Sequence, residues 1–571
     1  MPESITPLAP LALGTLVHLC IKASGVELDA KGWHIIGVYF SGLITLFCHA
    51  FFISGLDLPS SAWQTFLTAT YFNVGLYSSI AIGRLLRLRN FPGPIPARLS
   101  QFYALSLTAK NNQFHLEVDK LHRQYGDFVR IGPRHISINR ASAIPLVYGP
   151  PSKCPKGPWY AQSGDDPSKQ SMFYTRSQEV QKNRRRAWDR GFSVKAVASY
   201  EDRVMSKTAR LIEQLRNRVG EPVNITAWAN TYALDIIGDV GLGTEFRSLD
   251  DGKDHPAIKG VHDSMAIIGF LSSVPWLLKI LSDTPGATRK FNLFKEYCGN
   301  QVVLKEKAST FHEHILELQT NKTPFQTLDR KHEPTDLLSW LLKARYENDR
   351  SAPPGKIALD EDARLIIIAG SDTTAAAVAN AVYYLAQDRR VLTKLQSILD
   401  AAFPNGSADW SYAEAKNITY VDHIINETLR LRPPVPSGLS RTTPPEGLQI
   451  DDVYIPGNTV VSIAAHTIQR DPRYYEDPEA FYPERWEGMS PETAPFLAFS
   501  RGATNCAGKQ FARMEMRASL SQIALNFDMH LADDGTPAYF DKNQRDTFTL
   551  TLPPLNAVFK ARVPGQSPSE K

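Results

Sequence analysis

The chain has 571 residues, 43% of them hydrophobic, and its 63 Lys and Arg against 59 Asp and Glu leave a formal charge of +4. These values exclude a disordered chain, and the near balance of charge excludes a nucleic-acid-binding protein. Five cysteines are too few for a disulfide framework in a chain of this length. The composition therefore predicts a large enzyme whose bulk lies in a reducing compartment.

Residues 1–90 contain three apolar runs that we interpret as a membrane anchor. The run 33–56 contains no Asp, Glu, Lys or Arg and is long enough to cross a hydrocarbon core of about 30 Å. The run 63–83 is also uncharged but more polar. The run 8–21 is short, and is either a third span or the core of a signal peptide. The sequence thus predicts two to three transmembrane helices.

The charges that flank these runs predict their orientation. Arg84, Arg87 and Arg89 directly follow the last run, whereas the loop between the two long runs carries only Asp57. By the positive-inside rule the arginine-rich end faces the cytosol. We therefore expect everything after residue 90 to be cytosolic.

A proline-rich hinge, 91–97, separates the anchor from one large domain, 98–571. Pro92, Pro94 and Pro96 predict a stiff, extended spacer. A hairpin is expected at 129–138, where two short strand patterns flank Gly132-Pro133. Helical patterns then dominate at 178–191, 200–219, 224–240, 290–320, 360–387, 389–402, 414–432 and 507–526, and strand patterns return at 448–464 and 547–560. The domain is predicted to be mostly α with a minor β part (α+β).

Two helical patterns in this domain carry unusual polar residues. The first contains the run Arg184, Arg185 and Arg186. The second is interrupted at 369–374, where Gly370 weakens the helix and Ser, Asp and Thr side chains compete for backbone hydrogen bonds. We expect the helix to be locally destabilised there.

Three short motifs follow in the last third of the chain. Glu427 and Arg430 form an E-x-x-R pair on one helix face, and the sequence P-E-R-W follows at 483–486. The third motif, 499–508, places Cys506 in a loop just before a strong helical pattern. The helix N-terminus favours the thiolate, which is the ligand that promotes O–O cleavage at a haem iron. No Cys or His lies near enough in sequence for a zinc site.

With these motifs in this order, the chain resembles the cytochrome P-450 haem-thiolate monooxygenases of the fungal microsomal type, over nearly all of residues 90–560. The resemblance implies the cytochrome P-450 fold, preceded here by N-terminal transmembrane helices, and haem b as cofactor. Cys506 would be the axial ligand, with Phe499 shielding the sulfur and Gly502 and Gly508 allowing close approach of the backbone.

The resemblance also assigns roles to residues outside the cysteine loop. Asp372 and Thr373 match the acid–alcohol pair that delivers protons during oxygen cleavage. The residues expected to bind the haem propionates are Arg184, Arg185 and Arg441, and those expected to form a structural network behind the haem are Glu427, Arg430 and Arg485. Many relatives carry an arginine where this chain has Thr504, which leaves one propionate contact unassigned, with Arg501 a nearby alternative.

The electrons must come from a partner, because the chain has no P-loop and no dinucleotide-binding fingerprint that opens a helix. The resemblance implies an NADPH-cytochrome reductase of the same endoplasmic reticulum membrane, so that NADPH is used indirectly. Four cations surround the cysteine, with Glu515 the only acid nearby in sequence, and they suit an acidic electron donor: Arg501, Lys509, Arg513 and Arg517.

The expected reaction is hydroxylation or another oxidation of a lipophilic small molecule by dioxygen, in a terpenoid, alkaloid or polyketide pathway of secondary metabolism. The apolar segment 267–280 is expected to dip into the bilayer, to roof the substrate channel or to be an ordinary core helix. Two alternatives remain open. One is a haem-thiolate isomerase or dehydratase that needs no reductase, and the other is a non-enzymatic membrane binder of haem or sterol.

Overall fold

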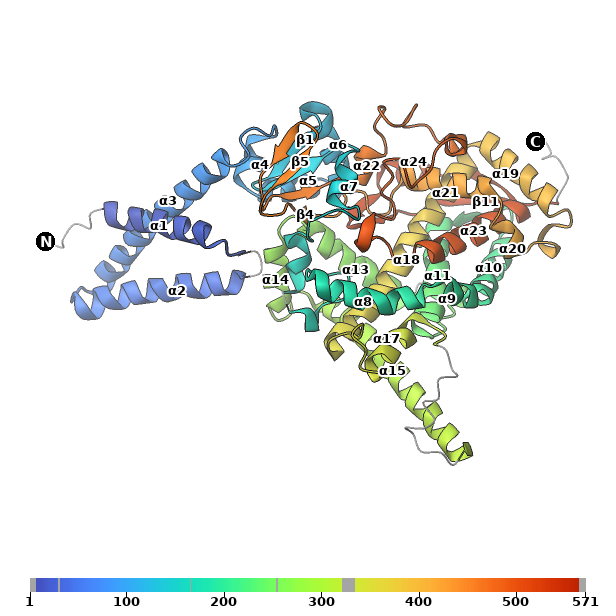
Figure 1. Cartoon of the computed structure of the whole chain (residues 1–571), viewed down its shortest axis with the longest axis horizontal. Helices are drawn as coiled ribbons and strands as arrows, with labels where there is room; N and C mark the ends of the chain where they lie inside the picture. The colour runs from blue at the N-terminus through green and yellow to red at the C-terminus, as the bar shows by residue number, and fades with distance from the viewer. Residues whose placement is uncertain (1–6, 29–30, 165, 253–254, 321–333, 564–571) are drawn as a thin grey trace.

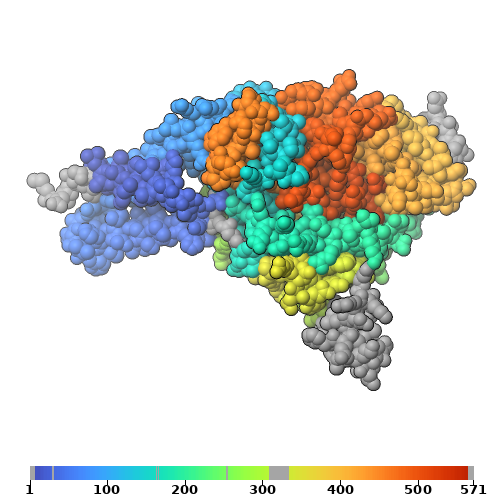
Figure 2. All heavy atoms as spheres, in the orientation of Figure 1, coloured from blue at the N-terminus to red at the C-terminus, as the bar shows by residue number. Residues whose placement is uncertain are grey.

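A computed structural model describes residues 7–28, 31–164, 166–252, 255–320 and 334–563. Three N-terminal helices form an arm that projects from a larger, mostly helical domain (Figures 1 and 2). They are α1 (Leu8–Ser24), α2 (Gly32–Cys48), which continues as a π-helix (His49–Ile53), and α3 (Leu58–Leu86). All three predicted apolar runs are therefore helical.

The helices α1 and α3 touch backbone to backbone. A Cβ atom on Gly14 would overlap the carbonyl oxygen of Phe72, and one on Gly75 would overlap that of Leu11. The hydroxyl of Thr15 donates across the contact to the carbonyl of Gly75 at 3.3 Å. Such small-residue contacts are typical of helix pairs in membranes, where close backbone approach replaces the hydrophobic effect as the driving force.

Among the described residues, two helices are long and apolar enough to cross a membrane: Gly32–Ile53 and Lys356–Gln387. The second is 78% buried and is the core helix of the large domain, whereas the first is only 6% buried. The helix α1 is shorter, and α3, which contains the run 63–83, is less apolar. Length and composition thus single out one exposed span of the expected two to three.

The hinge is less extended than expected. Residues Ile95–Leu99 form a short helix, α4, with Pro96 in its first turn, a position at which proline needs no amide donor. The other short helices are α5 (Phe102–Thr108), α6 (Phe114–Tyr125), α7 (Ala143–Val147), α9 (Val194–Ser199), α12 (Ser248–Asp251), α17 (Leu337–Tyr346), α22 (Ala465–Ile468) and α24 (Thr536–Lys542).

The predicted hairpin is present and belongs to a four-stranded sheet. Strand β1 (Phe128–Gly132) is antiparallel to β2 (His135–Ile138), which runs parallel to β7 (Val460–Ser462); β4 (Arg441–Thr442) completes the order β1-β2-β7-β4. The later strand patterns divide into short pieces: β5 (Leu448–Ile450), β6 (Val453–Ile455), β9 (Arg545–Thr547), β10 (Thr549–Thr551) and β11 (Asn556–Ala561), the last pairing with β3 (Pro222–Asn224) and β8 (Phe527–Leu531).

Most long helices lie within a few residues of the predicted ranges: α8 (Gln178–Gly191), α10 (Glu201–Arg216), α11 (Ile225–Ile236), α15 (Arg289–Thr320), α18 (Lys356–Gln387), α19 (Arg389–Ala402) and α23 (Lys509–Asn526). The pattern 414–432 is two helices, α20 (Tyr412–Ala415) and α21 (Thr419–Leu431). The segment 267–280 joins α13 (Pro256–Leu271) to α14 (Pro275–Asp283), because Pro275 begins a new helix.

The expected interruption of α18 at 369–374 was wrong, since the helix is continuous there. The hydroxyl of Ser371 donates to the Ile367 carbonyl, and that of Thr373 donates to the Ala369 carbonyl, both at 2.7 Å. These side chains therefore bond within the helix rather than breaking it. Gly370 is needed for packing, because a Cβ atom there would overlap Ile237 of the π-helix Ile237–Leu242.

Candidate active site

Cys506 lies in a loop between a short 3-10 helix (Gly502–Thr504) and the start of α23. Its backbone N–H donates to the carbonyl of Phe499 at 2.9 Å, which closes the loop under the sulfur. Gly502 has φ of +68°, and a Cβ atom there would overlap the Tyr148 carbonyl. The glycine is thus required by the turn and by neighbouring backbone, and it does not itself line the cavity that we describe next.

An inner cavity of about 290 Å³ opens above Cys506. Phe499 and Gly508 line it on the side of the cysteine, and Ala369, Gly370 and Thr373 line it from α18. Burial raises the pKa of the Cys506 thiol, and the Gly508 N–H and the cations Arg185 and Lys509 offset this only in part.

Three cations line one part of this cavity: Arg441, Arg185 and Lys156. Arg441 donates to the hydroxyls of Thr504 at 2.8 Å and Tyr160 at 3.3 Å. Arg185 donates to the carbonyl and side-chain oxygens of Asn505, next to the cysteine, at 2.8 and 3.0 Å. Two of the three predicted propionate-binding arginines are thus beside the cysteine loop.

The third predicted arginine, Arg184, points elsewhere. It is buried and donates to the Asp362 carboxylate and to the Gln170 carbonyl, both at 2.6 Å, and it does not line the cavity. Consecutive residues on a helix point about 100° apart, and here Arg185 faces the cavity while Arg184 faces Asp362 on α18. Arg501 is also turned away and donates to the carbonyls of Pro491 and Ala494.

Lys156 was missed by the sequence interpretation. Its side chain is buried, and it donates to the Phe173 carbonyl at 2.6 Å. Burial, with repulsion from Arg441, Arg184 and Arg185, lowers its pKa to about 7. Its backbone forms an isolated bridge with Arg441, a contact across nearly 300 residues that no local pattern reports.

The acid–alcohol pair is divided between two environments. Thr373 lines the inner cavity, whereas Asp372 is buried beside it and does not. The Asp372 carboxylate accepts a hydrogen bond from the hydroxyl of Thr549, which does line the cavity, and its other oxygen lies 3.5 Å from His262 Nε2 on α13. Asp372 therefore contacts the cavity through Thr549.

The three residues expected to form a network behind the cavity are in contact. Glu427 Oε1 accepts from Arg430 at 2.8 Å and from Arg485 at 2.9 Å, and Trp486 Nε1 donates to Oε2 at 3.0 Å. The guanidinium of Arg430 also donates to the carbonyls of Gln469, Pro478 and Ala480. A buried ion pair needs such further partners, and here it joins α21 to the segment 469–486.

Acids that are distant in sequence offset half of the charge of the basic cluster around the cysteine, which the interpretation of the sequence did not include. Asp422 on α21 pairs with both Arg513 and Arg517 at 2.8 Å, and Glu492 pairs with Lys509 at 3.0 Å. These acids are close only in the folded chain. Lys182 and Arg186 are exposed cations one turn apart on α8, the helix whose Arg185 contacts the cysteine loop.

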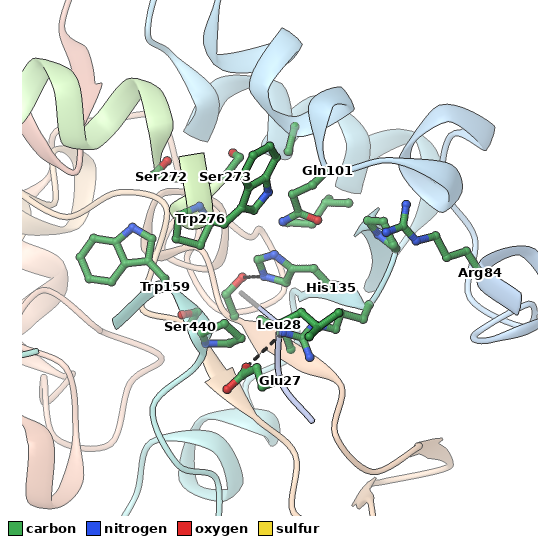
Figure 3. Close-up of a pocket in the computed structure, with 18 of the residues that line it drawn as sticks. Glu27, Leu28, Arg84, Gln101, His135, Trp159, Ser272, Ser273, Trp276 and Ser440 are labelled. Carbon is green, nitrogen blue, oxygen red and sulfur yellow. Dashed lines mark hydrogen bonds and ion pairs between the residues drawn. The ribbon is translucent and has the colours of Figure 1, made fainter. Parts of the chain in front are cut away.

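A second, outer cavity of about 750 Å³ lies where the arm, the four-stranded sheet and α14 meet. Figure 3 shows Trp159 and Trp276 on one side and polar side chains, including Gln101 and His135, facing the same space. Glu27, which follows α1, pairs with Arg134 at 3.1 Å and Arg176 at 2.6 Å and so fastens the arm to the domain.

The two cavities share part of their walls, and Phe548 belongs to both. Its ring stacks on Trp159 with centroids 4.7 Å apart and planes inclined by 16°. Phe548 also has φ of +80°, a strained conformation for a bulky residue, and such strain persists only where the surroundings impose it. Phe548 thus forms part of the shared wall, together with Val435, Gly438 and Leu439, and Trp159 packs on it from the outer cavity.

The residues around the inner cavity fit a haem. Cys506 lies on one wall and small residues of α18 lie on another. The cations Arg441, Arg185 and Lys156 are available for the two propionate carboxylates of a haem. Among the described residues no cluster of three or more His, Cys, Asp or Glu could hold a bare metal ion.

The comparisons with known proteins agree with this geometry. The model of the family described as Cytochrome P450 matches residues 92–561. The chain is 34% identical over 562 residues to cytochrome P450 monooxygenase FCK2 of Fusarium pseudograminearum, with 96% of each chain covered. It is 35% identical over 494 residues to cytochrome P450 monooxygenase orf5 of Eupenicillium brefeldianum, and this match covers 86% of this chain and 95% of the relative.

Among solved structures, the crystal structure of the cytochrome P450DA heme domain superposes with a TM-score of 0.64 at 17% sequence identity. The match covers 81% of this chain and 95% of that one. At this level of identity the likeness concerns the fold alone.

Proposed function

The chain belongs to the cytochrome P450 family and is a P450 monooxygenase, and from this premise we propose that it is anchored in the endoplasmic reticulum membrane and oxidises a lipophilic small molecule. The observation that carries the proposal is the inner cavity, which joins Cys506 and Thr373 to the cations Arg441, Arg185 and Lys156. Family membership implies a haem iron bound by a cysteine thiolate and electrons supplied by a redox partner.

Within this proposal Cys506 Sγ would ligate the haem, and Arg441, Arg185 and Lys156 would hold its propionates. The bound haem would activate dioxygen and insert oxygen into a C–H bond. Arg185 also ties α8 to the cysteine loop directly, through its two hydrogen bonds to Asn505. Because the carboxylates of the propionates favour charged cations, we expect haem binding to raise the low pKa of Lys156.

We assign the proton supply to the groups that join Asp372 to the cavity. The Thr549 hydroxyl bonds to Asp372 and lines the cavity, and His262, whose side chain is 32% exposed, lies against the other carboxylate oxygen. A proton could pass from solvent to the cavity through these three side chains. The Thr373 hydroxyl, held by the Ala369 carbonyl, is the second polar group at the cavity wall.

Membrane anchoring is supported by the exposed apolar helix Gly32–Ile53 and by the arginines that follow α3. The outer cavity lies at the junction of this arm and the catalytic domain, so a substrate dissolved in the membrane has a short route inward. This arrangement favours a lipophilic substrate, which we place in secondary metabolism. Lys182 and Arg186 offer a positive face for an NADPH-dependent reductase.

The test is the difference spectrum of the reduced, carbon-monoxide-treated protein in membranes. We expect the long-wavelength Soret band of thiolate-ligated haem, and its loss in Cys506→Ser. Absence of that band in the wild-type protein would refute the assignment. Incubation with reductase, NADPH and candidate terpenoid, alkaloid or polyketide intermediates then identifies the substrate, and glycosylation tags at the N-terminus report the topology of the arm.

A further inference from the structure

A buried arginine lies in the wall of the inner cavity, on α18 ahead of Asp372 and Thr373. Arg364 is only 4% exposed and lines the cavity together with Tyr174. Its Nε and Nη2 donate to Glu361 Oε2 at 2.9 and 2.5 Å. A guanidinium has five N–H groups; the bonds to Glu361 use two of them, and Arg364 also shares a side-chain hydrogen bond with the Tyr174 hydroxyl, which leaves two N–H groups for a ligand.

The charges around Arg364 do not balance. Glu361 is paired with Arg364 and also with Lys295 on α15, whose Nζ lies 2.9 Å from Oε1, so one carboxylate serves two cations. The neighbouring acids have other partners, since Asp362 pairs with Arg184 and Asp360 with Lys356. The cluster of Arg364, Glu361 and Lys295 therefore carries a net positive charge beside the cavity.

The surroundings keep this arginine charged and fixed in place. Burial lowers the pKa of Arg364, but the Glu361 carboxylate outweighs burial and raises it above the ordinary value. The guanidinium carbon also lies 5.3 Å from the ring centroid of Phe291 and 5.9 Å from that of Tyr174. A charged group held in an apolar cavity wall binds an oxygen acceptor more strongly than it would in water.

We propose that Arg364 binds a carboxylate or carbonyl oxygen of the substrate and so selects lipophilic molecules that carry such an oxygen. Arg364 and Thr373 are nine residues apart on one helix, or about 13 Å along its axis at 1.5 Å per residue. The acceptor oxygen is therefore remote from the carbon that is oxidised near Thr373. This inference rests on the proposed monooxygenase function.

The experiment compares three probes of equal chain length that differ at one end: dodecanoate, methyl dodecanoate and dodecane. Binding to the full-length protein in membranes is followed by the Soret shift, which reports only ligands that reach the inner cavity. In the wild-type protein we expect dodecanoate to bind roughly 10- to 100-fold more tightly than dodecane, as a charge-assisted hydrogen bond allows. An ester as tight as the carboxylate would identify a neutral carbonyl as the group recognised.

Three variants separate recognition from structure. Arg364→Met is expected to abolish the preference, and Glu361→Gln to strengthen it, because the competing carboxylate is removed. Arg562→Met is the matched control: Arg562 pairs with Asp400, has a side chain 9% exposed and lines neither cavity, so the preference should be unchanged.

The outcomes distinguish failure of the substrate-binding role of Arg364 from failure of the proposed monooxygenase function. If the wild-type protein shows the long-wavelength band but the probe preference survives in Arg364→Met, only the inference about Arg364 is overturned. Arg364 is then a structural partner of Glu361. Should Arg364→Met fail to fold, Arg364→Gln and Glu361→Gln serve in its place, and an unchanged preference in both overturns the inference. A wild-type protein without the band refutes the proposed function and the inference with it.

Discussion

Replacement of Trp159 by alanine should speed the passage of ligands between the two cavities. Phe548 belongs to the walls of both cavities and stacks on Trp159 at 4.7 Å, so opening the wall breaks this stack. An aromatic pair contributes about 0.5–1.5 kcal/mol beyond its buried area. At about 1.4 kcal/mol per factor of ten, the rate constants for binding and release should each rise roughly 2- to 12-fold.

The equilibrium constant should stay nearly unchanged, because the stack contributes to the barrier and not to the inner binding site. Stopped-flow measurement of the Soret shift with a lipophilic ligand gives both rate constants. Trp159→Phe should preserve slow exchange, since a second aromatic ring can stack on Phe548. Phe102→Ala is the control, because Phe102 packs on Trp276 at the outer cavity and does not contact the stacked pair. Unchanged rates, or a change in release alone, would refute a gate at this position.

Three further predictions concern proton supply, a buried acid and the reductase. Thr373→Ala should keep the carbon-monoxide spectrum but lower the product formed per NADPH by about tenfold or more, with peroxide formed in its place. Thr373→Ser keeps a hydroxyl and should stay coupled. Equal coupling in the two variants would exclude a role of the Thr373 hydroxyl in proton supply. Burial raises the pKa of the Glu515 carboxyl well above 4.5 in the folded protein. The stability of the protein should therefore fall as the pH rises above the pKa that this carboxyl has in the unfolded chain. Glu515→Gln should therefore melt at the same temperature as wild type near pH 4 and progressively higher toward pH 7, and a pH-independent difference contradicts this. Changing Lys182 and Arg186 to Glu should slow reduction of the haem by NADPH and reductase, and the effect should be larger at low salt. Reduction by dithionite, which needs no docking, should keep its rate. The control Lys560→Glu changes another exposed lysine and should leave both rates unchanged.

The sequence alone located the helices and the cysteine loop because both are encoded locally. Periodic apolar residues predicted α8, α18 and α19 to within a few residues, and the hairpin followed from two strand patterns around one turn. Cys506 could be identified because its loop and the helix that follows it are contiguous in sequence. The pair Glu427 and Arg430 was predictable in the same way, since residues three apart share a helix face.

The different surroundings of neighbouring helix residues could not be assigned without the fold. Arg184 and Arg185 are adjacent in sequence, yet one pairs with Asp362 while the other reaches the cysteine loop. Asp372 and Thr373 divide in the same manner, because the direction of each side chain depends on which elements pack around the helix. The sequence supplied the residue types, but their orientation depended on packing.

Contacts between distant segments were decided entirely by tertiary structure. Lys156 meets Arg441 through a single backbone bridge, and Asp422 pairs with two arginines of α23 that the sequence had presented as a free basic face. Arg364 lines the cavity only because α18 crosses the domain beside it. Hydrophobic periodicity specifies which face of an element is buried, but charge pairing and cavity walls arise from segments hundreds of residues apart, whose proximity is set by the packing of the whole domain.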